Sequence, residues 1–177
     1  FKSLTSWETG YAYKQFIKTF AENTESLIMG EPEDEYTTIQ AGQATGELVG
    51  GNLSLFTKLV CGKYAVNLQG KILFLEELGF EAAPEMVNSN IYYLKQNGVF
   101  DKIAGLWIGN YEHPSKISLE KIIMNAIGDE YKFPIIKSDN FGHIDKKIII
   151  PIGTKAEINT NEKIKIKLVE KCVDKGK

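Results

Sequence analysis

The chain has 177 residues, of which 43% are hydrophobic and 25% are charged, and these values suit one globular domain with a substantial core. The formal net charge of −2 argues against nucleic acid or an anionic membrane as a partner. No apolar run approaches the ~20 residues of a membrane span. The two cysteines and two histidines show no zinc-ligand spacing.

The first third of the chain predicts a helix, a loop and a strand-to-helix junction. Apolar residues at helical spacing predict a helix over 13–21. The acidic segment 31–35 contains Pro32 and indicates a solvated loop. The pair Gly50-Gly51 predicts a break before a helix over 53–60, either as a tight turn or as an anion site formed by backbone N–H groups. The tight turn is favoured, because the phosphate-loop pattern of lysine and serine is absent.

The middle of the chain alternates strand-like and helix-like stretches. Strands are predicted over 71–75, 103–108 and 133–136, with Trp107 expected in the core. The helices between them begin at Pro84 and after Ser118, where proline and serine are typical of a helix start. This alternation predicts parallel βαβ units and an α/β fold.

The last third predicts only strands, over 147–152, 155–158 and 163–169. The last of these alternates isoleucine and leucine with lysine, which is typical of a half-exposed strand, and lysine on its open face discourages edge pairing. We expect antiparallel pairing here, a flexible tail over 171–177, and a single domain over 1–177.

Two segments carry candidate site residues. His143 follows the loop-forming run 138–140 and has Gly142 beside it, so its ring can project into a cleft. Glu76 and Glu77 follow an apolar strand, where site residues of open α/β sheets gather. A carboxylate that orients a histidine is a standard pairing in acyl transfer. The alternatives are a surface histidine and two solvated glutamates, and the sequence does not decide between Glu76 and Glu77.

The ordered set of these motifs resembles the C-terminal domain of the LD-carboxypeptidase family, which comprises serine peptidases related to the microcin-immunity hydrolases. The resemblance covers about 43–159, and the first forty or so residues match only weakly. The matching strings are GELVGGNL from Gly46, GKILFLEE from Gly70, GVFDKIAG from Gly98, FGH from Phe141 and PIG from Pro151.

The resemblance implies a layered β/β/α domain within a two-domain enzyme that has a Ser-Glu-His triad. Glu76 and His143 would be the catalytic residues that this chain supplies. The family's serine lies in an N-terminal domain, in a Gly-Tyr/Phe-Ser-Asp turn that this sequence does not contain. We therefore expect the C-terminal part of an enzyme whose nucleophile domain is missing, and no activity from this part alone.

By the same resemblance, the whole enzyme would be cytoplasmic, would need no cofactor, and would remove a terminal D-amino acid from peptidoglycan tetrapeptides during cell-wall recycling. One alternative is a microcin-immunity-type hydrolase of a peptide–nucleotide antibiotic. The stretch 29–45 is short and lacks tryptophan, which favours the cell-wall substrate. Another alternative is a non-catalytic binding or dimerisation module, and a homodimer stays open. We expect an exposed, partly apolar face around Glu76 and His143, where the missing domain would dock.

Overall fold

The computed structural model describes residues 10–22 and 24–173. Within them, a short α-helix continues into a π-helical turn, and seven strands and three further helices follow. In chain order the elements are α1 (Tyr11–Phe16), η2 (Ile17–Glu22), β1 (Thr37–Gln40), β2 (Gln43–Asn52), α2 (Leu53–Val60), β3 (Ile72–Glu76), α3 (Pro84–Gln96), β4 (Gly105–Ile108), α4 (Leu119–Ile127), β5 (Ile135–Lys137), β6 (Lys155–Asn159) and β7 (Ile166–Leu168).

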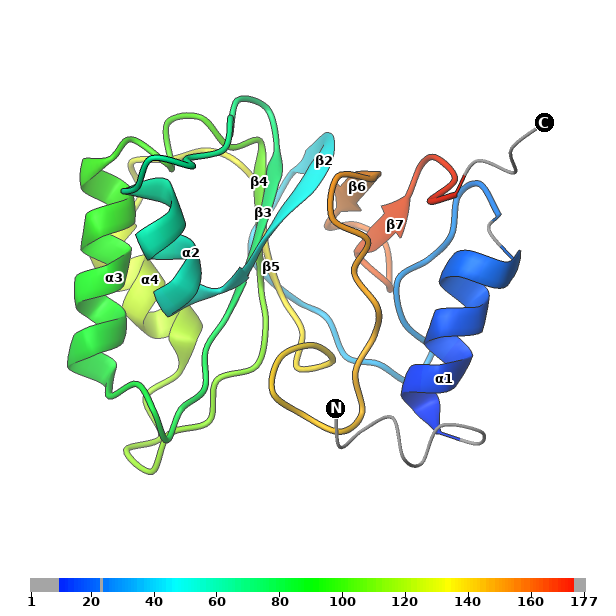
Figure 1. The fold of residues 1–177 in the computed structure, drawn as a ribbon, viewed down its shortest axis with the longest axis horizontal. Helices are drawn as coiled ribbons and strands as arrows, with labels where there is room; N and C mark the ends of the chain where they lie inside the picture. Colours follow the sequence, from blue (N-terminus) through cyan, green and yellow to red (C-terminus); the bar gives the residue numbers. More distant parts are fainter. Residues whose placement is uncertain (1–9, 23, 174–177) are drawn as a thin grey trace.

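The elements form three layers (Figure 1). The strands lie in the order β1-β5-β4-β3-β2-β6-β7, with β2 to β5 parallel and the outer pairings antiparallel. Helices α2, α3 and α4 cover one face of the parallel strands, and β6, β7 and α1 lie on the other side. The first apolar core lies between the helices and the sheet, and the second core lies between the sheet and the layer of β6, β7 and α1. The expected α/β class, with a parallel centre and antiparallel C-terminal strands, is confirmed.

Strand β2 links the parallel and antiparallel parts of the sheet. Its first half pairs with β6 and its second half with β3. A Cβ atom on Gly50 would lie 1.8 Å from the carbonyl oxygen of Phe74, so no side chain fits there. Gly50 and Gly51 both have φ +145° and stay within β2. The predicted break at this pair is therefore wrong, and the strand runs on to Asn52.

Most of the predicted helices and strands are present within a few residues of their expected bounds, and Trp107 is fully buried. The predicted strand over 147–152 is wrong. Ile148 is buried, but its N–H donates to Asn140 O in the preceding loop, 2.8 Å away, instead of joining a ladder. Within this apolar run, Ile148 and Ile150 pack in the second core, whereas Ile152 is 68% exposed.

The predicted last strand is shorter than expected, since β7 covers only three residues. Its outer edge is covered by main chain from residues 27–29. Met29 N–H donates to Ile166 O at 3.1 Å, and Leu168 N–H donates to Leu27 O at 2.7 Å. Here the edge is closed by an extended segment, and the lysines are not what protects it.

The acidic segment 31–35 is not simply solvated, as its charges had indicated. Asp34 is only 8% exposed and accepts several hydrogen bonds. The predicted flexible tail begins with residues 171–173, which lack regular structure, and its last residues, 174–177, lie outside the described part of the chain.

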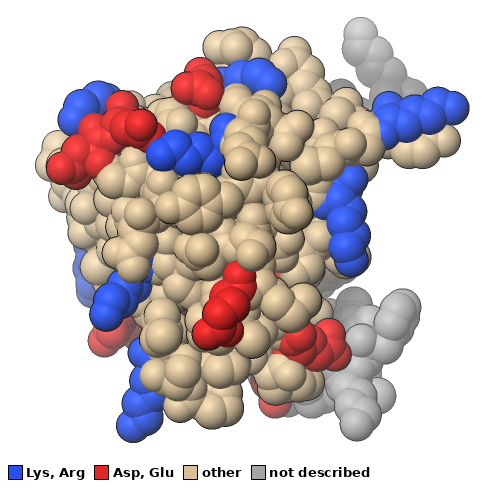
Figure 2. Space-filling view, turned by 90° about the vertical axis from the view of Figure 1, so that its left-hand side faces the viewer, with Lys and Arg blue, Asp and Glu red and all other residues tan. Residues whose placement is uncertain are grey.

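The outer face of the helical layer carries few charges across its middle (Figure 2). Several of its apolar side chains are exposed on α2 and α3, namely Leu55, Leu59, Met86, Tyr92 and Tyr93. Each helix within residues 10–22 and 24–173 is too short or too polar to span a bilayer.

Candidate active site

The two residues expected to form a pair are in contact. Glu76 is the last residue of β3, and its Oε2 lies 2.9 Å from Nδ1 of His143. The Glu76 side chain is 8% exposed, whereas the His143 side chain is 52% exposed. A buried carboxylate thus holds one ring nitrogen, and the rest of the imidazole faces the solvent.

His143 lies in a segment without helix or strand, residues 138–148, which we call the histidine loop. Phe141 anchors this loop to the sheet. Its ring packs against Trp107 with centroids 4.6 Å apart, and its carbonyl oxygen accepts a hydrogen bond from Asn110 N–H at 3.0 Å. The loop therefore begins from a fixed point in the second core.

Gly142 allows the histidine loop to approach Glu76. Its φ is +126°, and a Cβ atom there would lie 3.1 Å from Glu76 Oε2 and 3.3 Å from Cβ of Asn110. A side chain at this position would be strained and would press on the carboxylate that holds His143. The glycine is thus part of the local geometry of the pair.

Glu77 is directed to the start of α2 instead. Its carboxylate accepts hydrogen bonds from Asn52 Nδ2 at 2.7 Å, from Ser54 N–H at 3.0 Å and from the Ser54 hydroxyl. A negative charge at a helix N-terminus is favourable. The helix start that one interpretation made an anion site is therefore occupied by this carboxylate, and Glu76 is the glutamate that meets His143.

A cavity of about 330 Å³ lies beside His143. Its wall combines polar side chains, one lysine and apolar side chains from α2, α3 and the segment after β3. The lining residues are Asn52, Ser54, Leu55, Lys58, Glu77, Leu78, Glu81, Ala82, Met86 and His143. Leu55 and Met86 are 64% and 57% exposed. The surface around His143 is thus open and partly apolar, as expected.

A second cavity, of about 290 Å³, lies against the same loop and is lined in part by Asp34, Asn140 and Lys146. These three residues were not among the site residues predicted from the sequence. No local pattern links position 34 to positions 140 and 146. In the part of the chain that the structure describes, no group of three or more His, Cys, Asp or Glu side chains is arranged to hold a metal ion.

The fold and the site together define a three-layer α/β domain with a carboxylate–histidine pair at the carboxyl end of its parallel strands. The LD-carboxypeptidase C-terminal domain model matches residues 45–158, which is more than half of the chain. The chain therefore belongs to the LD-carboxypeptidase family and corresponds to its C-terminal domain.

Relatives with curated names agree with this assignment. The chain is 33% identical to the "Probable murein peptide carboxypeptidase" of Bacillus subtilis (strain 168) over 175 residues, which are 95% of this chain and 51% of that protein. It is 26% identical to the microcin C7 self-immunity protein MccF of Escherichia coli over 70% of this chain and 36% of that protein. The chain thus spans about a third to a half of the length of these relatives.

Solved structures show the same fold. MccF in its inactive mutant apo state superposes with a TM-score of 0.69 at 23% identity, over 80% of this chain and 43% of that one. The muramoyltetrapeptide carboxypeptidase of Oxalobacter formigenes superposes with a TM-score of 0.67 at 19% identity, over 88% of this chain and 53% of that one.

Proposed function

We propose that this chain supplies the glutamate and the histidine of a serine-type LD-carboxypeptidase that releases the terminal D-amino acid of peptidoglycan tetrapeptides. The observation that carries the proposal is the contact of Glu76 with His143 beside an open cavity, in a domain of this family. The serine nucleophile would come from an N-terminal region such as the one that makes up the rest of the longer relatives.

The geometry gives each residue a role. A carboxylate accepts hydrogen bonds, so it favours the ring form in which Nδ1 carries the proton and donates to Glu76. Nε2 is then unprotonated and able to take the proton of the serine as its oxygen attacks the amide carbon. His143 next gives that proton to the leaving amine, and Glu76 stabilises the charged ring in between. Water repeats the sequence to release the shortened peptide.

The cell-wall peptide is the substrate that the comparisons favour over a peptide–nucleotide antibiotic. The murein peptide carboxypeptidase shares 33% identity over nearly the whole chain, against 26% over a shorter span for the microcin immunity protein. The short stretch before β2, which lacks tryptophan, points the same way.

The test uses the full-length protein in which an N-terminal region of the family precedes this chain. D-alanine release from a muramoyl tetrapeptide is measured for the parent, for His143→Ala and for Glu76→Ala. We expect losses on the order of 10⁴ to 10⁶ in kcat, as for other histidine and carboxylate members of serine triads.

His113→Ala is the matched control, because His113 is the second histidine of the chain and its Nδ1 bonds only locally, to Ser115. This variant should keep the parent rate. Equal rates for the parent and for His143→Ala would overturn the assigned roles. A folded parent that releases no D-alanine would overturn the substrate.

A further inference from the structure

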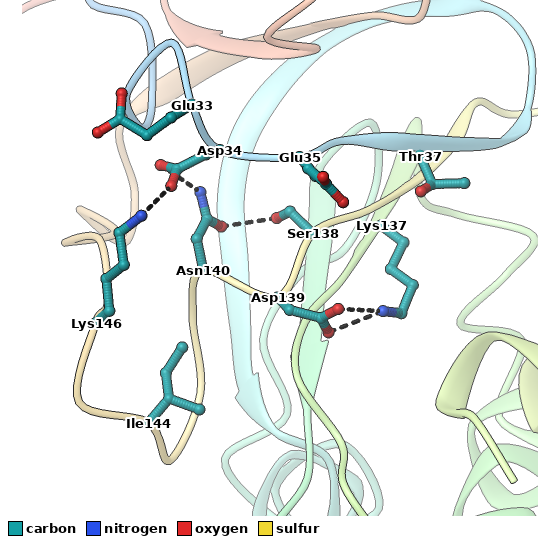
Figure 3. A pocket seen from close by; sticks show the side chains of 10 residues that line it. All are labelled: Glu33, Asp34, Glu35, Thr37, Lys137, Ser138, Asp139, Asn140, Ile144 and Lys146. Atoms are coloured by element: carbon teal, nitrogen blue, oxygen red, sulfur yellow. Dashed lines mark hydrogen bonds and ion pairs between the residues drawn. The ribbon is translucent and has the colours of Figure 1, made fainter. Parts of the chain in front are cut away.

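One side chain that is distant in the sequence, that of Asp34, contacts the histidine loop at two points. Asp34 Oδ2 lies 3.3 Å from Asn140 Nδ2, and Asp34 Oδ1 lies 3.0 Å from Lys146 Nζ. Asn140 and Lys146 stand three residues before and three residues after His143. Figure 3 shows both side chains pointing at Asp34 from the two arms of the histidine loop.

Asp34 is itself held firmly. The Tyr11 hydroxyl donates to its Oδ2, and Glu31 N–H donates to the same oxygen at 2.9 Å. The Lys146 ammonium also lies over the Tyr11 ring, 4.6 Å from its centroid. With a side chain that is 4% exposed, this carboxylate is a fixed buried charge whose hydrogen bonds are satisfied by named donors.

The charge state of this group agrees with its contacts. Burial alone would raise the pKa of Asp34, but hydrogen bonds from Tyr11, from Glu31 N–H, from Lys146 and from Asn140 together lower the pKa below its ordinary value. Burial and the adjacent Asp34 carboxylate raise the pKa of Tyr11, so its hydroxyl stays a donor. The anchor is therefore an ionised carboxylate at neutral pH.

Other hydrogen bonds hold the histidine loop on the side of Asn140. The Asn140 amide also donates to the Tyr36 hydroxyl at 2.8 Å and accepts from the Ser138 hydroxyl at 2.7 Å. Ile148 N–H closes the loop onto Asn140 O. On the other side of His143, by contrast, the Lys146–Asp34 ion pair joins the histidine loop to the segment 31–35, which precedes β1.

We propose that Asp34 is a positioning residue for His143. The Asp34 carboxylate joins both sides of the histidine loop and so holds the imidazole of His143 against Glu76. Asp34 does not line the cavity beside His143, so it acts through the loop and not on the substrate. The benefit to catalysis rests on the proposed function, but the effect on the Glu76–His143 contact does not.

Asp34→Asn is the sharpest variant, because it keeps the shape of the side chain and removes the charge. Whichever way the amide is oriented, its NH₂ group replaces an acceptor and faces either Lys146 or the donors on Oδ2. The matched control is Asp139→Asn. Asp139 lies in the same loop but pairs with Lys137, two residues away, at 2.7 Å, so this ion pair is local (Figure 3).

The first measurement uses this chain alone. Nitrogen-15 NMR of its two histidines reports which ring nitrogen of His143 carries the proton, and hydrogen exchange reports the N–H groups of Asn110 and Ile148, which donate to the loop. Asp34→Asn should mix the two ring forms of His143 and lower the exchange protection of both amides about tenfold. Asp139→Asn should leave both signals at their parent values.

A second pair of variants keeps the test decisive if Asp34→Asn does not fold. Lys146→Ala removes one side of the anchor at a side chain that is 54% exposed, and Lys137→Ala is its control. In the full-length enzyme, the Asp34 and Lys146 variants should lower kcat on the order of 10-fold to 10²-fold with KM within about twofold, because misplacement of a catalytic group affects chemistry more than binding.

The outcomes separate the two proposals. Unchanged ring form and protection in Asp34→Asn and in Lys146→Ala would overturn the positioning role and leave the proposed function standing. Disturbed NMR signals in these variants, together with a full-length parent that has no carboxypeptidase activity, would support the positioning of His143 and overturn the proposed function.

Discussion

The start of helix α2 and the histidine loop border the same cavity, but they are fixed by different means. Helix α2 has regular backbone bonds, a cap from Asn52 to Leu55 N–H at 3.2 Å, and the Glu77 carboxylate from the adjacent strand end. The histidine loop has no regular structure and depends on Asp34, which lies more than a hundred residues away in the sequence. The start of α2 is fixed by residues that are close to it in the sequence or in the sheet, whereas the histidine loop is held by a side chain that is distant in the sequence.

The difference has a consequence for the two adjacent glutamates. Glu77 is saturated by donors and serves the structure of α2, whereas Glu76 meets one half-exposed imidazole. Removing Glu77 should therefore reduce stability most, and changes around Glu76 should alter the site more than the fold.

Glu77→Ala should lower the free energy of unfolding by about 3 kcal/mol, because it removes a buried charge and leaves the half-buried donors Asn52 and Ser54 at the start of α2 without their acceptor. Urea denaturation measures the loss, and hydrogen exchange at Ser54 and Leu55 locates it. Glu81→Ala is the control, since Glu81 lines the same cavity but is exposed, and it should stay within about 0.5 kcal/mol of the parent. Similar losses of stability in Glu77→Ala and Glu81→Ala would contradict a structural role of Glu77 at the start of α2.

Gly142→Ala should cost about 1–3 kcal/mol, because alanine is strained at φ +126° and its Cβ presses on Glu76. It should also break the Glu76–His143 contact, which the ring nitrogens of His143 report by NMR. Gly153→Ala is the matched control. The φ of Gly153 is +87°, but no atom lies within 4 Å of the added Cβ. Gly153→Ala should therefore cause similar backbone strain and leave the Glu76–His143 contact intact. An intact contact in Gly142→Ala would show that the loop adapts.

The Asp34 anchor should appear as a pH-dependent part of the stability. Its pKa is lowered in the folded chain, so its contribution is fully present above the ordinary value of 3.8 and is lost as pH falls through the lower folded value. The stability difference between the parent and Asp34→Asn should thus be constant near neutral pH and shrink in acid. Tyr11→Phe removes one donor and should keep part of this dependence. A difference that is independent of pH down to the acid transition would contradict an ionised anchor.

The parts that could be predicted from the sequence are those that depend on local pattern. Helical spacing and apolar runs located the central βαβ units, and strand alternation is why Glu76 and Glu77 diverge. The motif order also led to the Glu76–His143 pair, through the family resemblance. These signals are short-range or follow from the order of elements in an α/β fold.

The parts that could not be predicted depend on contacts between distant segments. The run 147–152 has the composition of a strand, but nothing local shows that the backbone of Ile148 bonds back to Asn140. Likewise, the acidic segment 31–35 is polar enough to be solvated, and only the fold brings Asp34 into contact with the histidine loop. The prediction of a break at Gly50 was wrong for a related reason. Position 50 requires glycine because the main chain of Phe74 in the neighbouring strand leaves no room for a side chain.

The smallest effect on stability is expected at the apolar rim of the cavity. Leu55 is 64% exposed and Met86 is 57% exposed, and both line this cavity, so replacing either with serine should change the free energy of unfolding by no more than about 0.5 kcal/mol. If this rim is where an N-terminal region of the family docks, the same variants should weaken binding of that region when it is added as a separate chain. Calorimetric titration measures the affinity.

Tyr92→Ser is the control for the rim. Tyr92 is 44% exposed on α3 but does not line the cavity beside His143, so its loss should leave this affinity unchanged. Exposed apolar surface beside the Glu76–His143 pair is expected where a partner covers it, and burying Leu55 and Met86 would then contribute to binding. Parent affinity in both rim variants would place the contact elsewhere. Weaker binding with unchanged stability would show that the cavity rim serves assembly of the site and not the fold of this domain.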